Sequence, residues 1–126
     1  MFELKVTSYF AAAHNLREFY GKCEKLHGHN WFVEVRVRVR DLDKIGIALD
    51  FGRLKIILGE ILELIDHQYL NELPTFKTLN PSSENITKFI FDQLAPRVGE
   101  ETGGRAGLYS VSVWESKNAS VTYSSD

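Results

Sequence analysis

Apolar and polar side chains alternate along two stretches in the first third of the chain, which is the pattern of β-strands buried on one face. In the first stretch, apolar residues occupy alternate positions over residues 2–6, and Phe10 and Ala12 continue the same parity. In the second, valine occupies every second position of residues 33–39, and charged side chains stand between the valines. Residues 15–24 are polar and mixed, so we expect a loop between the two strands.

Two later segments carry apolar residues at helical spacing. The first covers residues 54–65 and follows Asp50, which is placed to cap a helix N-terminus. The second begins with an Asn-Pro pair at residues 80–81, which fits an N-cap followed by proline in the first turn. Its apolar stripe covers residues 86–94, and we expect the helix to end at Pro96 because proline breaks the hydrogen-bond pattern.

Alternation returns at residues 109–113 and again at residues 119–123, with a turn at Lys117-Asn118 between them. The order is therefore strand, strand, helix, helix, strand, strand. This order predicts an α+β fold, in which a four-stranded antiparallel sheet carries two helices on one face, as a single domain over residues 1–126. Such a sheet has two exposed edges, which are a liability in a monomer, so we also expect a homo-oligomer.

Composition narrows the classes of function. The chain has 126 residues, 44% hydrophobic and 25% charged, which is typical of a soluble globular domain. No apolar run approaches the ~20 residues of a membrane span, so no membrane partner is expected. The formal net charge is -2, and the arginines of residues 36–40 lack interleaved aromatic residues. We therefore expect a solvated or subunit-facing strand there, and no nucleic-acid partner.

The single cysteine excludes an internal disulfide framework. Residues 1–5 lack the basic and apolar segments of an export signal. Together these features predict a reducing, cytoplasmic setting.

Three of the four histidines share one face of the predicted sheet. His14 has the parity of the apolar residues in the first strand, and His27 and His29 have the parity of the valines in the second. If the two strands pair as a hairpin, the three imidazoles converge near one end of its apolar face. Three neutral imidazoles suit zinc, with a fourth position for water or substrate. The alternative is ordinary core histidines that donate to backbone carbonyls.

Three further positions each have two interpretations. Cys23, beside charged loop residues, is either a small buried residue or a thiolate base. The Asp66-His67 pair is either a favourable helix end or a proton relay. Glu115 has the parity of an apolar strand face. It is either solvated beyond the end of the strand or bound to a ring edge with two adjacent N–H donors.

These residues, in this order, resemble the 6-pyruvoyl-tetrahydropterin synthase family, whose bacterial branch includes 6-carboxy-tetrahydropterin synthase. The resemblance spans nearly the whole chain. It rests on the segments Phe10 to His14, Cys23 to His29, Leu49 to Phe51, Leu64 to His67, Tyr69 to Asn71, Pro81 to Glu84, and Val113 to Glu115.

The resemblance implies the tunnelling fold, in which subunits assemble into a barrel, commonly as a dimer of trimers, with active sites at the interfaces. It also implies a role for each candidate residue. His14, His27 and His29 bind zinc. Cys23 is the proton-abstracting base, with Asp66 and His67 completing its relay. Glu115 anchors the pterin ring, and Ser82 and Ser83 line the pterin pocket.

The short gap between Cys23 and His27 resembles the spacing found in the carboxy-forming bacterial branch. That branch converts 7,8-dihydroneopterin triphosphate to 6-carboxy-5,6,7,8-tetrahydropterin, acetaldehyde and triphosphate for 7-deazaguanine and queuosine synthesis. Glu24 departs from the pattern of the carboxy-forming branch, because a glutamate near this position marks members that form 6-hydroxymethyl-dihydropterin for folate synthesis. A folate-branch or dual-activity lyase, a pyruvoyl-forming enzyme and a non-catalytic pterin- or metal-binding protein are the alternatives.

Overall fold

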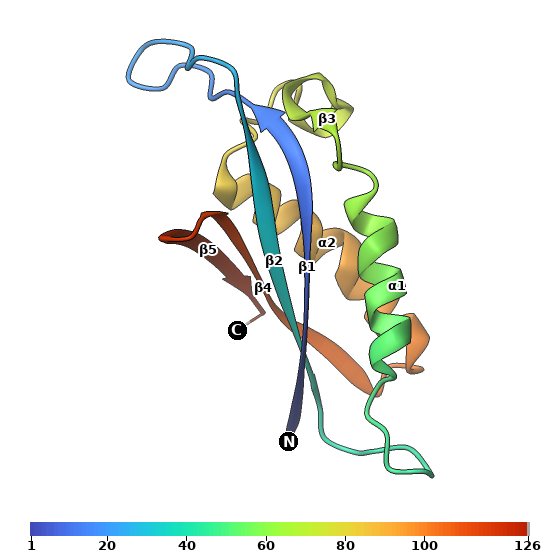
Figure 1. Cartoon of the computed structure of the whole chain (residues 1–126). Helices are drawn as coiled ribbons and strands as arrows, with labels where there is room; N and C mark the ends of the chain where they lie inside the picture. The colour runs from blue at the N-terminus through green and yellow to red at the C-terminus, as the bar shows by residue number, and fades with distance from the viewer. Residues whose placement is uncertain (126) are drawn as a thin grey trace.

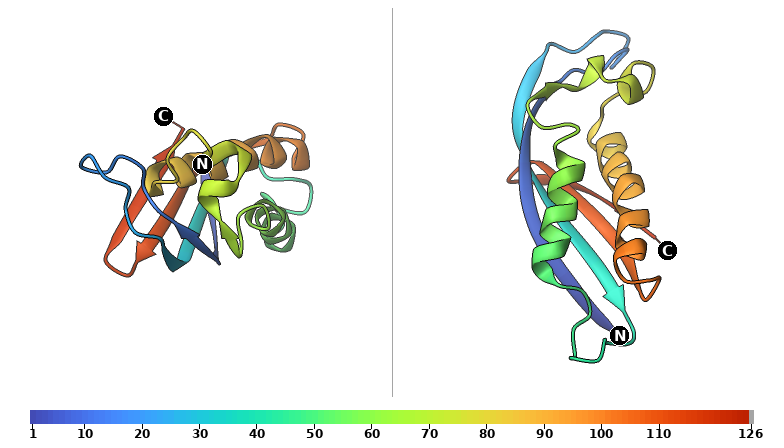
Figure 2. Two further views of the ribbon diagram at one scale, coloured as in Figure 1. Left: turned by 90° about the horizontal axis from the view of Figure 1, so that it is seen from above. Right: turned by 90° about the vertical axis from the view of Figure 1, so that its right-hand side faces the viewer.

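The computed structural model describes residues 1–125. Figure 1 shows a twisted sheet in front of two long helices, and Figure 2 shows that both helices lie on the same side of the sheet. The elements in chain order are β1 (Phe2–His14), β2 (His27–Val39), α1 (Phe51–Leu62), β3 (Gln68–Tyr69), two 3-10 turns (Leu70–Glu72 and Pro74–Phe76), α2 (Ser83–Glu101), β4 (Ala106–Ser116) and β5 (Ala119–Ser124).

The strand order in the sheet is β3-β1-β2-β4-β5, so the expectation of four antiparallel strands is wrong in one respect. The four long strands pair antiparallel, but β3 adds a fifth strand that runs parallel to Ala12 and Ala13 of β1. Two residues are too few to show alternation in the sequence. The backbone N–H of His67 donates to the carbonyl of Ala11 at 2.5 Å, which holds the segment before β3 against β1.

The core lies between the inner face of the sheet and the two helices. The alternate valines of β2 are buried, as are the predicted apolar stripes of α1 and α2, except that Phe89 is only half-buried. Asp50 caps α1 as expected, with its side chain accepting from the backbone N–H of Arg53 at 3.0 Å. The α+β class with two helices on one face is confirmed.

Helix α2 differs from its prediction at both ends. Ser82, not Asn80, is the N-cap, and its hydroxyl accepts from the backbone N–H of Asn85. The helix passes through Pro96 and continues to Glu101. Pro96 is exposed, and so is Asp92, whose carbonyl loses its helical partner. Burial of Val98, one turn beyond Leu94, favours continuation of the helix.

The charged face of β2 carries paired charges. Glu3 of β1 accepts from both Arg36 and Arg38, at 3.2 and 3.0 Å, and Arg36 also pairs with Glu34. Glu3 on the neighbouring strand and Glu34 on the same strand therefore offset the charge of these two arginines. Among the helices of residues 1–125, none is long and apolar enough to cross a membrane.

Candidate metal centre

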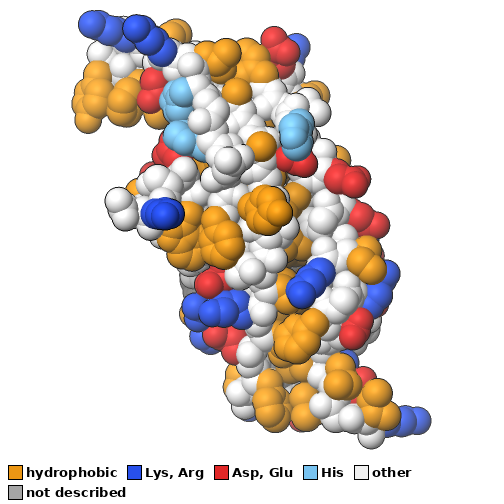
Figure 3. Space-filling model, in the orientation of Figure 1, with side chains coloured by type: hydrophobic (Ala, Val, Ile, Leu, Met, Phe, Trp, Pro, Cys, Tyr) orange, Lys and Arg blue, Asp and Glu red, His pale blue; other side chains and the backbone are white. Residues whose placement is uncertain are grey.

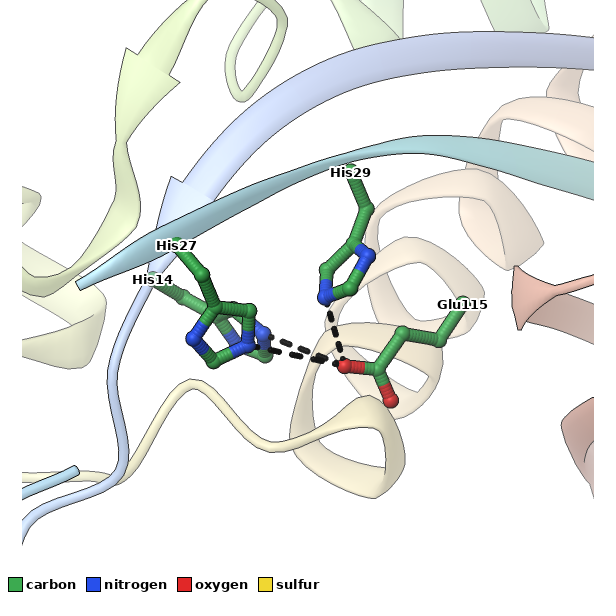
Figure 4. A group of neighbouring side chains, drawn as sticks. All are labelled: His14, His27, His29 and Glu115. Atoms are coloured by element: carbon green, nitrogen blue, oxygen red, sulfur yellow. Dashed lines mark ion pairs between the residues drawn. The ribbon is translucent and has the colours of Figure 1, made fainter. Parts of the chain in front are cut away.

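The three histidines meet where the β1–β2 hairpin opens. The ladder pairs His14 with His27 and Ala12 with His29, so all three side chains leave the same face of the sheet. Glu115, near the end of β4, points into the same space (Figure 4). One ligand atom from each of the four residues lies within 4.8 Å of the others. The parity of the sequence therefore corresponds to a compact group of nitrogen and oxygen donors.

Backbone carbonyls fix the tautomer of two imidazoles. His14 Nδ1 lies 2.7 Å from the carbonyl of Pro81, and His27 Nδ1 lies 2.9 Å from the carbonyl of Lys25. Because a carbonyl only accepts, each Nδ1 carries the proton and donates it. Each Nε2 then presents a lone pair, the form in which histidine binds a metal.

Within residues 1–125, the Nε2 atoms of His14 and His29 are buried and make no hydrogen bond of good geometry, although Oε1 of Glu115 lies 3.4 and 2.8 Å from them. Such orphaned atoms are rare in native proteins because their desolvation is costly. Burial lowers the pKa of His29, while the carboxylate of Glu115 opposes that shift. The Nε2 atoms of the histidines and a carboxylate oxygen of Glu115 face one another at short range, so the residues fit a metal ion of the kind that imidazole prefers, such as zinc.

Glu115 reaches the centre of the three histidines. Its Oε1 lies 2.8 Å from Nε2 of His29, 3.4 Å from that of His14 and 3.8 Å from that of His27. Ligands of a tetrahedral zinc ion are separated by roughly 3.3 Å, so these distances also suit a fourth ligand. The β4–β5 pairing shifts register between Trp114 and Ser116, leaving Glu115 at an irregularity that aims its side chain.

Cys23 lies in the loop between β1 and β2 and is exposed. Glu24 is half-buried, and its Oε1 accepts from the backbone N–H of Leu16 at 3.1 Å. The same oxygen lies 3.9 Å from His27 Nδ1. The loop thus brings Glu24 to the edge of the histidine group.

The Asp66-His67 pair lies outside the group. Beyond the end of α1, the Nδ1 of His67 is 3.0 Å from the Oδ1 of Asp66, and the His67 side chain is 81% exposed. Figure 3 shows histidines at two separate places on this face of the molecule. Within residues 1–125, neither side chain hydrogen-bonds or ion-pairs with the histidine group. The backbone N–H of Ala11 donates to Asp66 and holds the pKa of that carboxyl below its usual value.

The two predicted serines have different surroundings. The Ser82 hydroxyl caps α2, while the Ser83 hydroxyl donates to Glu115 Oε2 at 3.4 Å. Sequence reasoning missed the supporting carbonyl of Pro81 and the fully buried Trp31, whose ring packs edge-on against His14 and His29. The parity of Trp31 matched that of the histidines and was a usable signal.

Comparison with known proteins gives one family. Residues 3–126 match the family model of 6-pyruvoyl tetrahydropterin synthase. A 6-pyruvoyl tetrahydrobiopterin synthase of Dictyostelium discoideum is 35% identical over 109 residues, covering 85% of this chain and 76% of the relative. A 6-carboxy-5,6,7,8-tetrahydropterin synthase of Synechocystis is 36% identical over 119 residues, covering 90% and 86%.

The fold agrees with the sequence comparison. The solved structure of Caenorhabditis elegans 6-pyruvoyl tetrahydropterin synthase superposes with a TM-score of 0.83 at 27% identity, over 99% of this chain and 96% of that one. With the family model matching nearly every residue, the chain belongs to the 6-pyruvoyl tetrahydropterin synthase family.

Proposed function

We propose that this chain is a zinc-dependent lyase that converts 7,8-dihydroneopterin triphosphate to 6-carboxy-5,6,7,8-tetrahydropterin, acetaldehyde and triphosphate. Atoms balance when one water is consumed. The observation that carries the proposal is the pair of orphaned histidine nitrogens beside Glu115, in a family of pterin synthases. The Synechocystis relative, named for this product, supports the choice of reaction.

His14, His27 and His29 would hold the metal. When bound, zinc supplies Lewis-acid activation of the substrate's side-chain hydroxyls. Glu115 offers two carboxylate oxygens, which complement the adjacent N–H donors of a pterin ring. Ser83 donates to that carboxylate and helps to fix its orientation. Ser82, one residue earlier, is assigned to the lining of the pterin pocket on the resemblance to the family.

Proton transfer falls to Cys23, Asp66 and His67. The Cys23 thiolate takes a proton from the carbon side chain, and His67, oriented by Asp66, returns one elsewhere. Within residues 1–125, the His67 side chain makes no hydrogen bond or ion pair with the histidine group. The Asp66-His67 pair therefore serves the site of a neighbouring subunit, and the complete active site lies at an interface. A dimer of trimers is the expected assembly.

The sheet supports this assembly through two open edges. Apart from the two residues paired with β3, the outer edge of β1 has no strand beside it within residues 1–125, and neither does the outer edge of β5. Unpaired edges recruit other strands. We expect light scattering to give a homo-oligomer, a hexamer in this proposal, at micromolar concentration; a monomer would contradict the shared site.

Mixing two inactive variants provides a sharper test of sharing. Cys23→Ala and His67→Ala proteins, denatured and refolded together, should regain part of the turnover, because some interfaces then combine an intact Cys23 with an intact His67. Each variant refolded alone is the control. No recovery in verified mixed oligomers would place both residues in one subunit's site.

The reaction itself is tested by product identity. Zinc-loaded protein is incubated with dihydroneopterin triphosphate, and the pterin products are identified by mass. We expect the 6-carboxy product together with acetaldehyde. A 6-pyruvoyl product, or release of 6-hydroxymethyl-dihydropterin from dihydroneopterin, would select one of the alternative reactions. Tight pterin binding without turnover would indicate a binding protein.

Replacing Glu115 with glutamine separates its two possible roles. The amide keeps the shape but loses the charged acceptor, so pterin affinity should fall roughly 10- to 150-fold, corresponding to roughly 1.5–3 kcal/mol. Zinc content should stay at the wild-type level. The affinity is measured by calorimetry, with Glu84→Gln, exposed in the first turn of α2, as the control. Loss of zinc would identify Glu115 as a metal ligand instead.

A further inference from the structure

The loop between β1 and β2 has two limbs, and the outgoing limb is firmly attached to the protein. Asn15 and Asn71 exchange two hydrogen bonds, from Asn15 N to Asn71 Oδ1 at 3.0 Å and from Asn71 Nδ2 to Asn15 O at 2.8 Å. The Tyr69 hydroxyl donates to Asn15 Oδ1 at 2.8 Å. The guanidinium of Arg17 donates to the carbonyls of Asn71, Phe76 and Leu79. This limb therefore has a fixed position relative to His14.

The returning limb, residues 22–26, carries Cys23. At the tip of the loop the Lys22 N–H donates to the Phe19 carbonyl at 3.1 Å, and nearer to His14 the limb is attached through one residue. Within residues 1–125, every hydrogen bond between this limb and residues 15–17 involves Glu24. Its backbone N–H donates to the carbonyl of Leu16 at 2.8 Å, and its own carbonyl accepts from Asn15 Nδ2 at 3.0 Å. Its carboxylate accepts from the Leu16 N–H at 3.1 Å. The remaining residues of this limb are exposed.

We propose that Glu24 is a positioning residue: it clasps the two limbs together and thereby sets the place of Cys23. The proposal rests on the proposed function, because it assumes that Cys23 transfers the proton. Cys23 is covalently next to Glu24, and Glu24 is hydrogen-bonded to the residue that follows His14. Three hydrogen bonds of Glu24, one from its carboxylate and two from its own N–H and carbonyl, thus link the proposed base to the residues that follow His14.

The geometry favours this role over that of a second base. The Oε1 of Glu24 is already used by a backbone N–H, and hydrogen bonds from N–H groups to carboxylates are among the stronger ones in proteins. Moving the carboxylate toward a substrate would break that bond. It would leave the limb held only by the two hydrogen bonds that the main chain of Glu24 makes. A glutamine side chain, by contrast, can accept the same hydrogen bond without being a base.

This difference defines the test. Zinc-loaded Glu24→Gln and Glu24→Ala proteins are compared with wild type in carboxy-forming turnover, zinc content and hydrogen exchange of residues 15–26. In Glu24→Ala we expect exchange at the Leu16 amide to accelerate roughly 10- to 100-fold, with a similar fall in kcat and little change in KM. Zinc content should not change. Glu24→Gln should restore both slow exchange and most of the turnover.

Two further variants complete the design. Glu18→Gln, an exposed carboxylate in the same loop, is the matched control and should behave as wild type. Asn15→Asp removes the donor to the Glu24 carbonyl and should speed exchange in the returning limb, so the clasp remains testable even if Glu24→Ala folds poorly.

Three outcomes would overturn the proposal. They are unchanged exchange in Glu24→Ala, wild-type kcat despite faster exchange, and a Glu24→Gln protein with slow exchange but no activity. The last outcome would assign the carboxylate a chemical role, as the dual-activity hypothesis requires. If the wild-type protein makes no carboxy product, the proposed function fails, while the exchange data still decide whether the clasp exists.

Discussion

Replacing His29 with alanine should reduce the zinc content of the purified protein from about one ion per subunit to near zero. The variant removes one of three nitrogen donors, and loss of a direct ligand should exceed the 10- to 100-fold effect that changes in supporting residues have on metal affinity. Within residues 1–125, the His29 Nε2 lies 2.8 Å from the Glu115 carboxylate and makes no hydrogen bond to the backbone, so the fold should tolerate the change. Metal analysis of the dialysed protein measures the result.

His67→Ala is the matched control, because His67 is exposed and lies outside the histidine group. It should keep the wild-type zinc content. His27→Ala should behave like His29→Ala. Undiminished metal in both His27→Ala and His29→Ala would exclude the proposed metal centre.

The Cys23→Ala variant should lower carboxy-forming turnover by about 10²- to 10⁴-fold, the usual contribution of a positioned acid or base. Zinc content should not change, because the thiol is assigned to proton transfer and not to metal binding. Steady-state kinetics and metal analysis on the same sample test both statements. Glu18→Gln again serves as the control within the loop.

Cys23→Ser refines the result. A serine hydroxyl is far less acidic than a thiol, so this variant should be nearly as slow as Cys23→Ala although it keeps a polar group in place. A Cys23→Ala protein that loses its metal and regains activity with excess zinc would contradict the assigned role.

The positions of the three histidines followed from the sequence because parity in a paired hairpin is a strict geometric rule. The valines of residues 33–39 identified the buried face, and His27 and His29 shared it. The sequence predicted which residues converge but not the hydrogen bonds that orient their side chains. The carbonyl of Pro81, which orients His14, lies 67 residues away, and no periodicity reports such a contact.

Other features escaped prediction for equally specific reasons. Strand β3 has two residues, too short for any periodic signal. Pro96 is a strong helix breaker locally, but burial of Val98 overrides it. The parity of Glu115 gave its face of the sheet, but the register shift between β4 and β5 at this position is not visible in the alternating sequence. Each of these features is set by tertiary contacts.

The hairpin ladder also determines where this chain tolerates changes in length. Inserting a single residue into β1 between Phe10 and His14 would turn His14 to the opposite face of the sheet and dismantle the donor group, because side chains alternate at every residue. Residues 18–22 lie beyond the ladder, and extra residues there leave the pairing of His14 with His27 unchanged. The tip of this loop can therefore become longer or shorter during evolution, which changes the surroundings of Cys23, while the three histidines keep their positions.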